Sequence, residues 1–169
     1  MEGRGISYQT ASDCGVVLGK KKYKPVIGFT YTNEKGELEA MKYRSANGDK
    51  IFWWEGNVNK LWGKQTINKE LPSVEKTVVI TEGELDQLSI KEAFKDTFNI
   101  TCYSVPNGAP SKISKGKIDP SEDNKFKYLW NDKDKFVDVD RIILAVDTDD
   151  SGEALAHELA RRLDIARCY

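Results

Sequence analysis

Two short acidic segments, each placed directly after a run of apolar residues, constrain the fold of this chain more than any other feature. The first, Thr81–Asp86 (TEGELD), follows Val78–Ile80, and the second, Asp147–Gly152 (DTDDSG), follows Ile142–Val146. Runs that are apolar at consecutive positions are typical of parallel strands that are buried on both faces. Because such sheets bind ligands at the carboxyl ends of their strands, both acidic segments are predicted to line one ligand-binding edge.

Strand-like and helix-like segments alternate from Val74 to the end of the chain. This alternation predicts βαβ units and therefore an α/β domain around a parallel sheet. The predicted strands are Val78–Ile80, Ile100–Val105 and Arg141–Val146, and the predicted helices are Glu84–Lys95, Phe126–Phe136 and Gly152–Leu163. Residues 106–124 are rich in Gly, Pro, Ser and Lys, and a connection of this length is often functional or mobile.

The beginning of the chain has the pattern of a small β-rich unit. Val26–Thr32 and Leu38–Arg44 have strand character, and Asn33–Gly36 between them suits a tight turn. We therefore expect a β-hairpin, with Ile51–Trp54 as a third strand. The break at Leu71–Ser73 predicts two domains, residues 1–72 and residues 73–169.

Charge and cysteine content exclude several classes of protein. The formal net charge is only −1, but the first half carries a series of basic residues while acidic residues mark the strand ends of the second half, so a nucleic-acid partner remains open. The three cysteines are isolated and have no CxxC spacing, which argues against a disulfide scaffold or a zinc ribbon. No apolar run approaches the roughly 20 residues of a membrane span, so we expect a cytoplasmic protein with no membrane partner.

Asp147 and Asp149 have the spacing of a metal site. Two residues apart in an extended segment, their side chains point to the same side and can both face one ion or a close pair of ions. Mg²⁺ binds a few carboxylate oxygens together with water and phosphate oxygens, and it neutralises charge during nucleotidyl transfer. Gly152 is expected to let the backbone turn sharply into the next helix. The alternative is that Asp147–Ser151 only caps that helix.

Glu82 is the candidate for acid–base chemistry. It follows a buried strand and precedes Gly83, which leaves room for a ligand or the backbone to approach. A carboxylate in this position can act as a general base toward a hydroxyl group or add a metal contact. Asp86, one helical turn further on, can aim at the same spot. Capping by Glu84 or Asp86 is the alternative, but two acidic strand ends in one chain are harder to explain by capping alone.

Together these residues resemble the Toprim domain, whose signature is a Glu-Gly pair after one strand and Asp-x-Asp after another. The matching residues are Glu82-Gly83 and Asp147-Thr148-Asp149. Further segments are similar, in order and over nearly the whole chain, to the primase half of phage primase-helicases and of their mitochondrial relative Twinkle. These segments are Arg4–Ser7, Lys42–Arg44, Leu61–Gly63, Val79–Asp86, Ser104–Ala109 and Ile143–Gly152.

The resemblance implies a DNA primase core that makes RNA primers on single-stranded DNA from nucleoside triphosphates. It implies a Toprim fold, a parallel sheet flanked by helices, preceded by a small β-rich or α+β primase-type subdomain, with the active site in the cleft between them. The implied cofactor is Mg²⁺ or Mn²⁺, held by Asp147, Asp149 and Glu82. Glu82 would be the catalytic glutamate, and Asp86 would support the site.

Contacts to nucleotide or template phosphates are also implied by the resemblance. The residues concerned are Lys42, Arg44, Lys50, Asn107 and Gly108. For the basic residues among them, a solvated hairpin surface is the alternative. Aromatic residues near them either offer stacking faces to bases or are buried in a core. These aromatic residues are Tyr43, Phe52, Trp53, Trp54 and Trp62.

Two features of the family are not found in this sequence, a zinc ribbon ahead of Arg4 and a helicase P-loop of the form GxxxxGK[ST]. We therefore expect an excised or truncated core that normally works with a helicase domain or protein. Two other functions remain open. One is a Toprim nuclease that cleaves phosphodiesters with the same metals, and the other is a catalytically silent module that docks DNA or a helicase.

Overall fold

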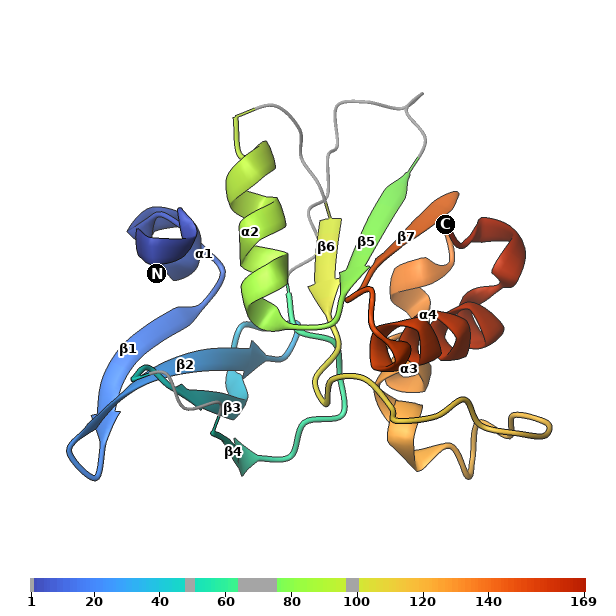
Figure 1. Ribbon diagram of the computed structural model, residues 1–169, viewed down its shortest axis with the longest axis horizontal. Coiled ribbons are helices and arrows are strands. Elements are labelled where there is room, and N and C mark those ends of the chain that lie inside the picture. The colour runs from blue at the N-terminus through green and yellow to red at the C-terminus, as the bar shows by residue number, and fades with distance from the viewer. Residues whose placement is uncertain (1, 48–50, 64–75, 97–100) are drawn as a thin grey trace. The chain divides into compact units, whose positions relative to one another are not determined.

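The computed structural model describes residues 2–47, 51–63, 76–96 and 101–169, which form two compact units (Figure 1). The first unit is Met1–Val58 and the second is Asn59–Tyr169. Lys50 and the predicted domain boundary at residues 72–73 lie outside the described residues. No helix in the described part of the chain is long and apolar enough to cross a membrane.

Within residues 2–47 and 51–58, the first unit is a four-stranded antiparallel sheet in the order β1-β2-β3-β4. Its elements are η1 (Glu2–Arg4), α1 (Tyr8–Asp13), β1 (Val16–Lys21), β2 (Lys24–Thr32), β3 (Leu38–Ser45) and β4 (Phe52–Gly56). The predicted β2–β3 hairpin is confirmed. The Asn33 side chain shapes its turn, because its Oδ1 accepts the backbone N–H groups of Lys35 and Glu37 at 3.0 and 2.9 Å. β1 and α1 were not predicted.

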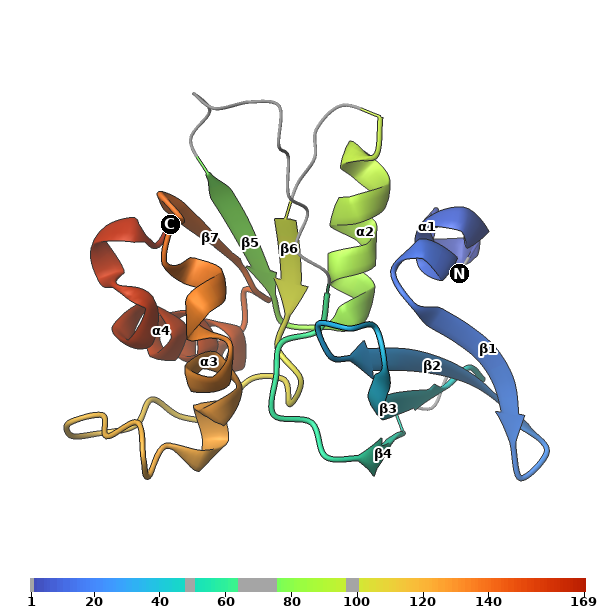
Figure 2. The ribbon, with the colours of Figure 1, turned by 180° about the vertical axis from the view of Figure 1, so that it is seen from behind.

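The second unit confirms the predicted α/β fold. Within residues 59–63, 76–96 and 101–169, three parallel strands lie in the order β6-β5-β7. The elements are β5 (Thr77–Thr81), α2 (Glu84–Phe94), β6 (Thr101–Ser104), η2 (Asn124–Phe126), α3 (Lys127–Asn131), η3 (Lys133–Phe136), β7 (Arg141–Ala145), α4 (Asp150–Leu163) and η4 (Ile165–Arg167). The helices flank the sheet, as Figure 2 shows from behind.

The core of the second unit lies on one face of this sheet. Val78 and Ile80 of β5 join Ile142 of β7 and the α4 residues Leu155 and Leu159 in one buried cluster. The apolar stripe of α4 therefore covers this face, as its helical spacing predicts.

The opposite face is covered less completely than the sequence indicates. α2 packs against β6 and β5, and Gln87 of α2 donates a hydrogen bond to the Cys102 carbonyl at 3.1 Å. At the β7 edge, however, Ile143 is 38% exposed. The prediction of burial on both faces is confirmed for β5 and is wrong for β7, because α2 packs mainly on β6 and β5.

The last residues of the chain continue the sheet beyond β7. The Leu144 N–H donates to the Tyr169 carbonyl and the Tyr169 N–H donates to the Ile142 carbonyl, both at 2.9 Å. Cys168 bridges Ile142 in parallel register. These bonds add Cys168 and Tyr169 to the edge of the sheet next to β7.

The predicted helix Phe126–Phe136 is interrupted. α3 ends at Asn131, and the chain continues as the 3-10 helix η3. The cause is a contact distant in sequence, because the carboxylate of Asp132 accepts the Leu61 N–H at 2.7 Å. An aspartate that bonds elsewhere competes with continuation of the helix.

The long connection between β6 and η2 is fastened to α4. Ser114 donates to the buried Glu158 carboxylate from its N–H and, at 2.7 Å, from its hydroxyl, while Arg161 donates to the Ser114 carbonyl at 2.8 Å. At the end of the connection, Arg162 donates to Asp123 at 2.6 Å and also binds Glu158. Burial acts to raise the pKa of Glu158, but the hydrogen bonds from Arg162 and Ser114 outweigh it, so the pKa is lowered.

Candidate metal-binding and catalytic site

The register of the parallel sheet brings the acidic segments to one edge. Thr81 at the end of β5 is level with Ser104 of β6 and with Ala145 of β7. Glu82 follows directly, and Asp147 lies two residues beyond β7. The ends of β5 and β6, with the start of α2, form the lower edge of the sheet in Figure 1. This arrangement agrees with the ligand-binding edge expected from the sequence.

Glu82 is half-buried and lies within the electrostatic reach of the other acids. Burial raises the pKa of its carboxyl group, and the negative charges of Asp147, Asp149 and Asp86 raise it further, while a hydrogen bond from the Asp147 backbone opposes the rise. Its Oε2 atom is buried and has no hydrogen-bond partner among the described residues. A positive charge placed here would both relieve the repulsion and satisfy this oxygen.

Asp149 caps the N-terminus of α4, as the alternative interpretation of the sequence predicts. This capping does not prevent Asp149 from also binding a metal ion. It is the N-cap residue of α4, and its Oδ1 accepts the Gly152 N–H at 2.8 Å. Asp147 and Asp149 are both exposed. A carboxylate has several lone pairs, so capping through one oxygen leaves the other available to an ion.

Gly152 is required for a different reason from the expected sharp turn, because it lies inside α4. An added Cβ would lie 1.9 Å from the carbonyl oxygen of Asp147 and 2.6 Å from its carbonyl carbon. The glycine therefore allows the Asp147 backbone to pass directly against the first turn of α4.

The absence of a side chain at Gly83 leaves space for the carboxylate of Asp86. It is the N-cap of α2, and an added Cβ would lie 2.8 Å from Oδ2 of Asp86. The Thr81 hydroxyl holds this turn by donating to the carbonyl oxygens of Gly83 and Tyr103, at 3.1 and 3.3 Å. The Asp86 carboxylate consequently lies next to the N-cap of α2, and its negative charge contributes to the raised pKa of Glu82.

The carboxylate oxygens at this edge suit a hard divalent cation that also binds water or phosphate oxygens. Among the described residues, no group of three or more His, Cys, Asp or Glu side chains is close enough to hold a metal ion alone. Mg²⁺ typically takes one or two carboxylates and completes its shell with water and phosphate oxygens. The unpartnered Glu82 oxygen and the exposed carboxylates of Asp147 and Asp149 suit such a partial site.

Asn107 and Gly108 follow β6 at the same sheet edge. Asn107 is exposed, and Gly108 has a positive φ of +65°. No atom lies within 4 Å of a Cβ added at Gly108, so this turn leaves open space at the edge. These features are compatible with the implied substrate contact.

Lys42 and Arg44 lie on the other unit, where they alternate along β3 and so share one face of the antiparallel sheet. The Lys42 ammonium lies 5.1 Å from the Trp54 ring centroid and 5.3 Å from that of Phe52, and the Arg44 guanidinium lies 5.6 Å from Phe52. Lys42 is buried, so part of its role is packing against aromatic rings. By contrast, Trp62 is buried in the second unit beside β6 and offers no stacking face.

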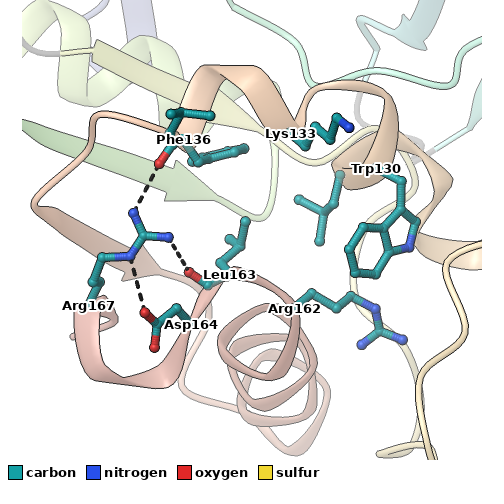
Figure 3. Close-up of a pocket in the computed structure, with 9 residues that line it drawn as sticks. Trp130, Lys133, Phe136, Arg162, Leu163, Asp164 and Arg167 are labelled. Carbon is teal, nitrogen blue, oxygen red and sulfur yellow. Dashed lines mark hydrogen bonds and ion pairs between the residues drawn. The ribbon is translucent and has the colours of Figure 1, made fainter.

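A cavity of about 250 Å³ lies at the opposite end of α4 from the acids. Figure 3 shows Arg167 at one side of it, where its guanidinium donates to the carbonyl oxygens of Phe136 and Leu163, both at 3.0 Å. It also donates to the Val139 carbonyl at 2.8 Å. Arg167 therefore supplies hydrogen-bond donors to backbone carbonyl groups near the C-terminal end of α4. The cavity is separate from the acidic edge.

Two sets of contacts were not predicted from the sequence, the ion pair that holds the long connection on α4 and the close approach of Gly152 to Asp147. Glu158 and Arg162 are four residues apart on a helix, a spacing that favours ion pairs. This spacing could have predicted their ion pair from the sequence. The close approach of Gly152 to the Asp147 backbone could not be predicted from the sequence, in which only the glycine hints at it.

Comparison with protein families shows that residues 76–168 match the Toprim domain. Two proteins of Arabidopsis thaliana are similar over 171 aligned positions and 98% of this chain. They are a "Twinkle homolog protein, chloroplastic/mitochondrial" at 41% identity and a "Primase homolog protein" at 43%. The chain spans 22% of the first and 46% of the second, less than half of either relative.

Solved structures show the same relationship. The primase fragment of the bacteriophage T7 primase-helicase matches with a TM-score of 0.74 and 25% identity, over 100% of this chain and 62% of that one. A T7 complex, in which primase domains bound to an RNA/DNA hybrid and dTTP interact with the lagging-strand DNA polymerase, matches with the same score over 99% of this chain and 76% of that one. A Pseudomonas aeruginosa DNA primase domain shares the fold, with a TM-score of 0.55 and 15% identity over 95% of this chain and 57% of that one.

Proposed function

Because this chain belongs to the Toprim domain family, we propose that it is the catalytic core of a DNA primase. The observation that carries the proposal is the acidic edge, where Glu82 has a raised pKa and an unpartnered buried oxygen beside Asp147 and Asp149. Similarity to the T7 primase fragment over the whole chain supports primer synthesis as the reaction.

We assign the divalent ion to this edge, since Toprim domains typically bind divalent metals. Asp147, Asp149 and Glu82 would hold Mg²⁺ or Mn²⁺, and Asp86 would support them. The ion would neutralise charge on the phosphate oxygens of the incoming nucleotide. Glu82 would accept the proton of the attacking ribose hydroxyl, a role that a raised pKa brings closer to working pH.

The proposed partners are single-stranded DNA, nucleoside triphosphates and a helicase. Nucleic acid and a nucleotide are bound by the T7 primase domains that this chain resembles, and the name of that protein includes a helicase. Lys42 and Arg44, with Asn107 and Gly108, are the proposed contacts to phosphates. A cytoplasmic location in a bacterial or phage-infected cell stays a prediction, because one relative is named as chloroplastic/mitochondrial.

Synthesis of dinucleotides from nucleoside triphosphates on single-stranded DNA tests this proposal. Glu82→Gln should reduce synthesis by about 10² or more and leave the fold and DNA binding intact, because it removes charge and keeps shape. Glu153→Gln, at an exposed acid in the first turn of α4, is the matched control and should remain active.

The two rival functions give different results in the same assay. If a full-length protein that contains this chain binds DNA but makes no dinucleotide with Mg²⁺ or Mn²⁺, the primase proposal fails in favour of a docking module. If it cuts single-stranded DNA in a Glu82-dependent manner, the site belongs to a nuclease.

A further inference from the structure

The turn between β1 and β2 is strained without an evident structural benefit. It consists of Lys22 and Tyr23, whose φ angles are +45° and +68°. Two positive φ angles are typical of a type I′ turn, which favours Asn-Gly because other residues are strained there. Tyr23 is 98% exposed, so its ring contributes nothing to the core. Strain at a residue that the fold does not use indicates a function.

The same turn also concentrates positive charge. Four of the five residues 20–24 are lysines. Lys21 lies directly opposite Lys24 in the strand register, and like charges in this position destabilise a sheet. Among the described residues, Lys21 pairs with Glu55, whereas Lys20, Lys22 and Lys24 have no acidic partner. Electrostatic repulsion and backbone strain therefore coincide at one hairpin tip.

Aromatic rings continue this surface along the sheet. The Tyr43 and Trp53 rings are stacked, with centroids 5.4 Å apart and planes 12° apart, and the Lys21 ammonium lies 4.6 Å from the Tyr43 centroid. Tyr43 and Trp53 are half-buried. Since Tyr43 lies between Lys42 and Arg44 in β3, it faces the opposite side of the sheet from them. The hairpin tip is at the end of β1 remote from α1 (Figure 1 and Figure 2).

We propose that this surface, the hairpin tip of residues 20–24 with the Tyr43–Trp53 pair behind it, binds single-stranded nucleic acid. The lysines would contact phosphates and Tyr23 would stack on an unpaired base, the combination that single-strand binding proteins use. A solvated lysine cluster would explain the charge but not a fully exposed tyrosine in a strained turn. The inference rests on the proposed function only for the choice of DNA as the strand.

The double variant Lys22→Asn, Tyr23→Gly tests the inference, because it builds the turn sequence that the backbone prefers. We expect its melting temperature to rise by about 2–4 °C, since the strain is relieved. We expect its affinity for oligo(dT) to fall on the order of tenfold as a stacked base is lost, and the slope of log affinity against log salt to fall by about 0.7 per lost phosphate contact. A gain in stability with a loss of binding cannot come from misfolding.

Lys35→Gln is the matched control, because it removes one lysine from the neighbouring β2–β3 turn and should leave binding unchanged. Binding is measured by fluorescence anisotropy with a chelator present, so no chemistry takes part. If wild type binds and the double variant binds equally well, the inference is overturned and the proposed function stands. If only binding to an acidic peptide is lost, the surface docks protein, and the inference also fails. If wild type binds no oligo(dT), the proposed DNA template is overturned as well.

Discussion

Replacing Gly152 by alanine should dismantle the acidic edge without unfolding the protein. The new Cβ would lie 1.9 Å from the Asp147 carbonyl oxygen, and an ordinary contact is about 3.5 Å, so the Asp147 backbone must retreat by about 1.6 Å. That backbone carries both the N–H bonded to Glu82 and one of the proposed metal ligands. A misplacement of about 1 Å can reduce activity on the order of 10²-fold.

The effect of Gly152→Ala on stability should be modest. Overpacking costs about 1–3 kcal/mol, but alanine is favoured over glycine in a helix by about 1 kcal/mol. The net loss of about 0–2 kcal/mol corresponds to a fall in melting temperature of no more than about 8 °C.

Thermal unfolding with Mn²⁺ measures the loss of the site directly. For a Kd of about 1 mM, 10 mM Mn²⁺ stabilises the wild type by about 1.4 kcal/mol, or about 3–6 °C. This rise should be absent from Gly152→Ala and present in Ser151→Ala, a control for helix propensity in the same turn. An equal Mn²⁺-induced rise in Gly152→Ala and wild type would refute the reasoning.

Three further perturbations test other parts of the account. The raised pKa of Glu82 means that the folded protein binds this proton more tightly than the unfolded chain, so stability falls as pH rises from the ordinary glutamate value to the raised pKa. Glu82→Gln should therefore raise the melting temperature at neutral pH without metal, and the gain should vanish near pH 4; a constant gain would contradict this. Replacing Lys42 and Arg44 by alanine should weaken single-stranded DNA binding and flatten its salt dependence, and an unchanged slope would leave them as surface or packing residues. Glu158→Gln should destabilise the protein by about 3 kcal/mol in denaturant titrations, because Arg162 loses a buried partner; a loss below about 0.5 kcal/mol would show that the tether contributes little.

The acidic edge was predictable because its signals are local. Two apolar runs, Val78–Ile80 and Ile142–Val146, predict parallel strands. Parallel strands of one sheet have their carboxyl ends at the same edge. The placement of Glu82, Asp147 and Asp149 at this edge therefore followed from their positions after the strands, and their catalytic and metal-binding roles stay predictions. The effect of Asp147 and Asp149 on the pKa of Glu82 depends on burial and on the close approach of the Asp147 backbone to Gly152. Both exist only in the folded structure.

The missed elements depend on contacts that sequence patterns do not encode. The β1–β2 hairpin turns at Lys22-Tyr23 instead of at glycine or asparagine, so no turn signal separates its strands. The interruption after α3 is caused by a bond from Asp132 to Leu61, far away in the sequence. In both places tertiary structure or local strain overrides propensity.

Paramagnetic line broadening by Mn²⁺ tests most directly whether the acidic edge is the metal site. In NMR spectra of the wild-type chain, the first signals to broaden should be those of Glu82–Asp86 and Asp147–Asp149, and Gly152→Ala should abolish the effect. Broadening confined to the lysine-rich segment 111–117, with Asp147 and Asp149 unaffected, would contradict the assignment of the metal and of the catalytic site with it.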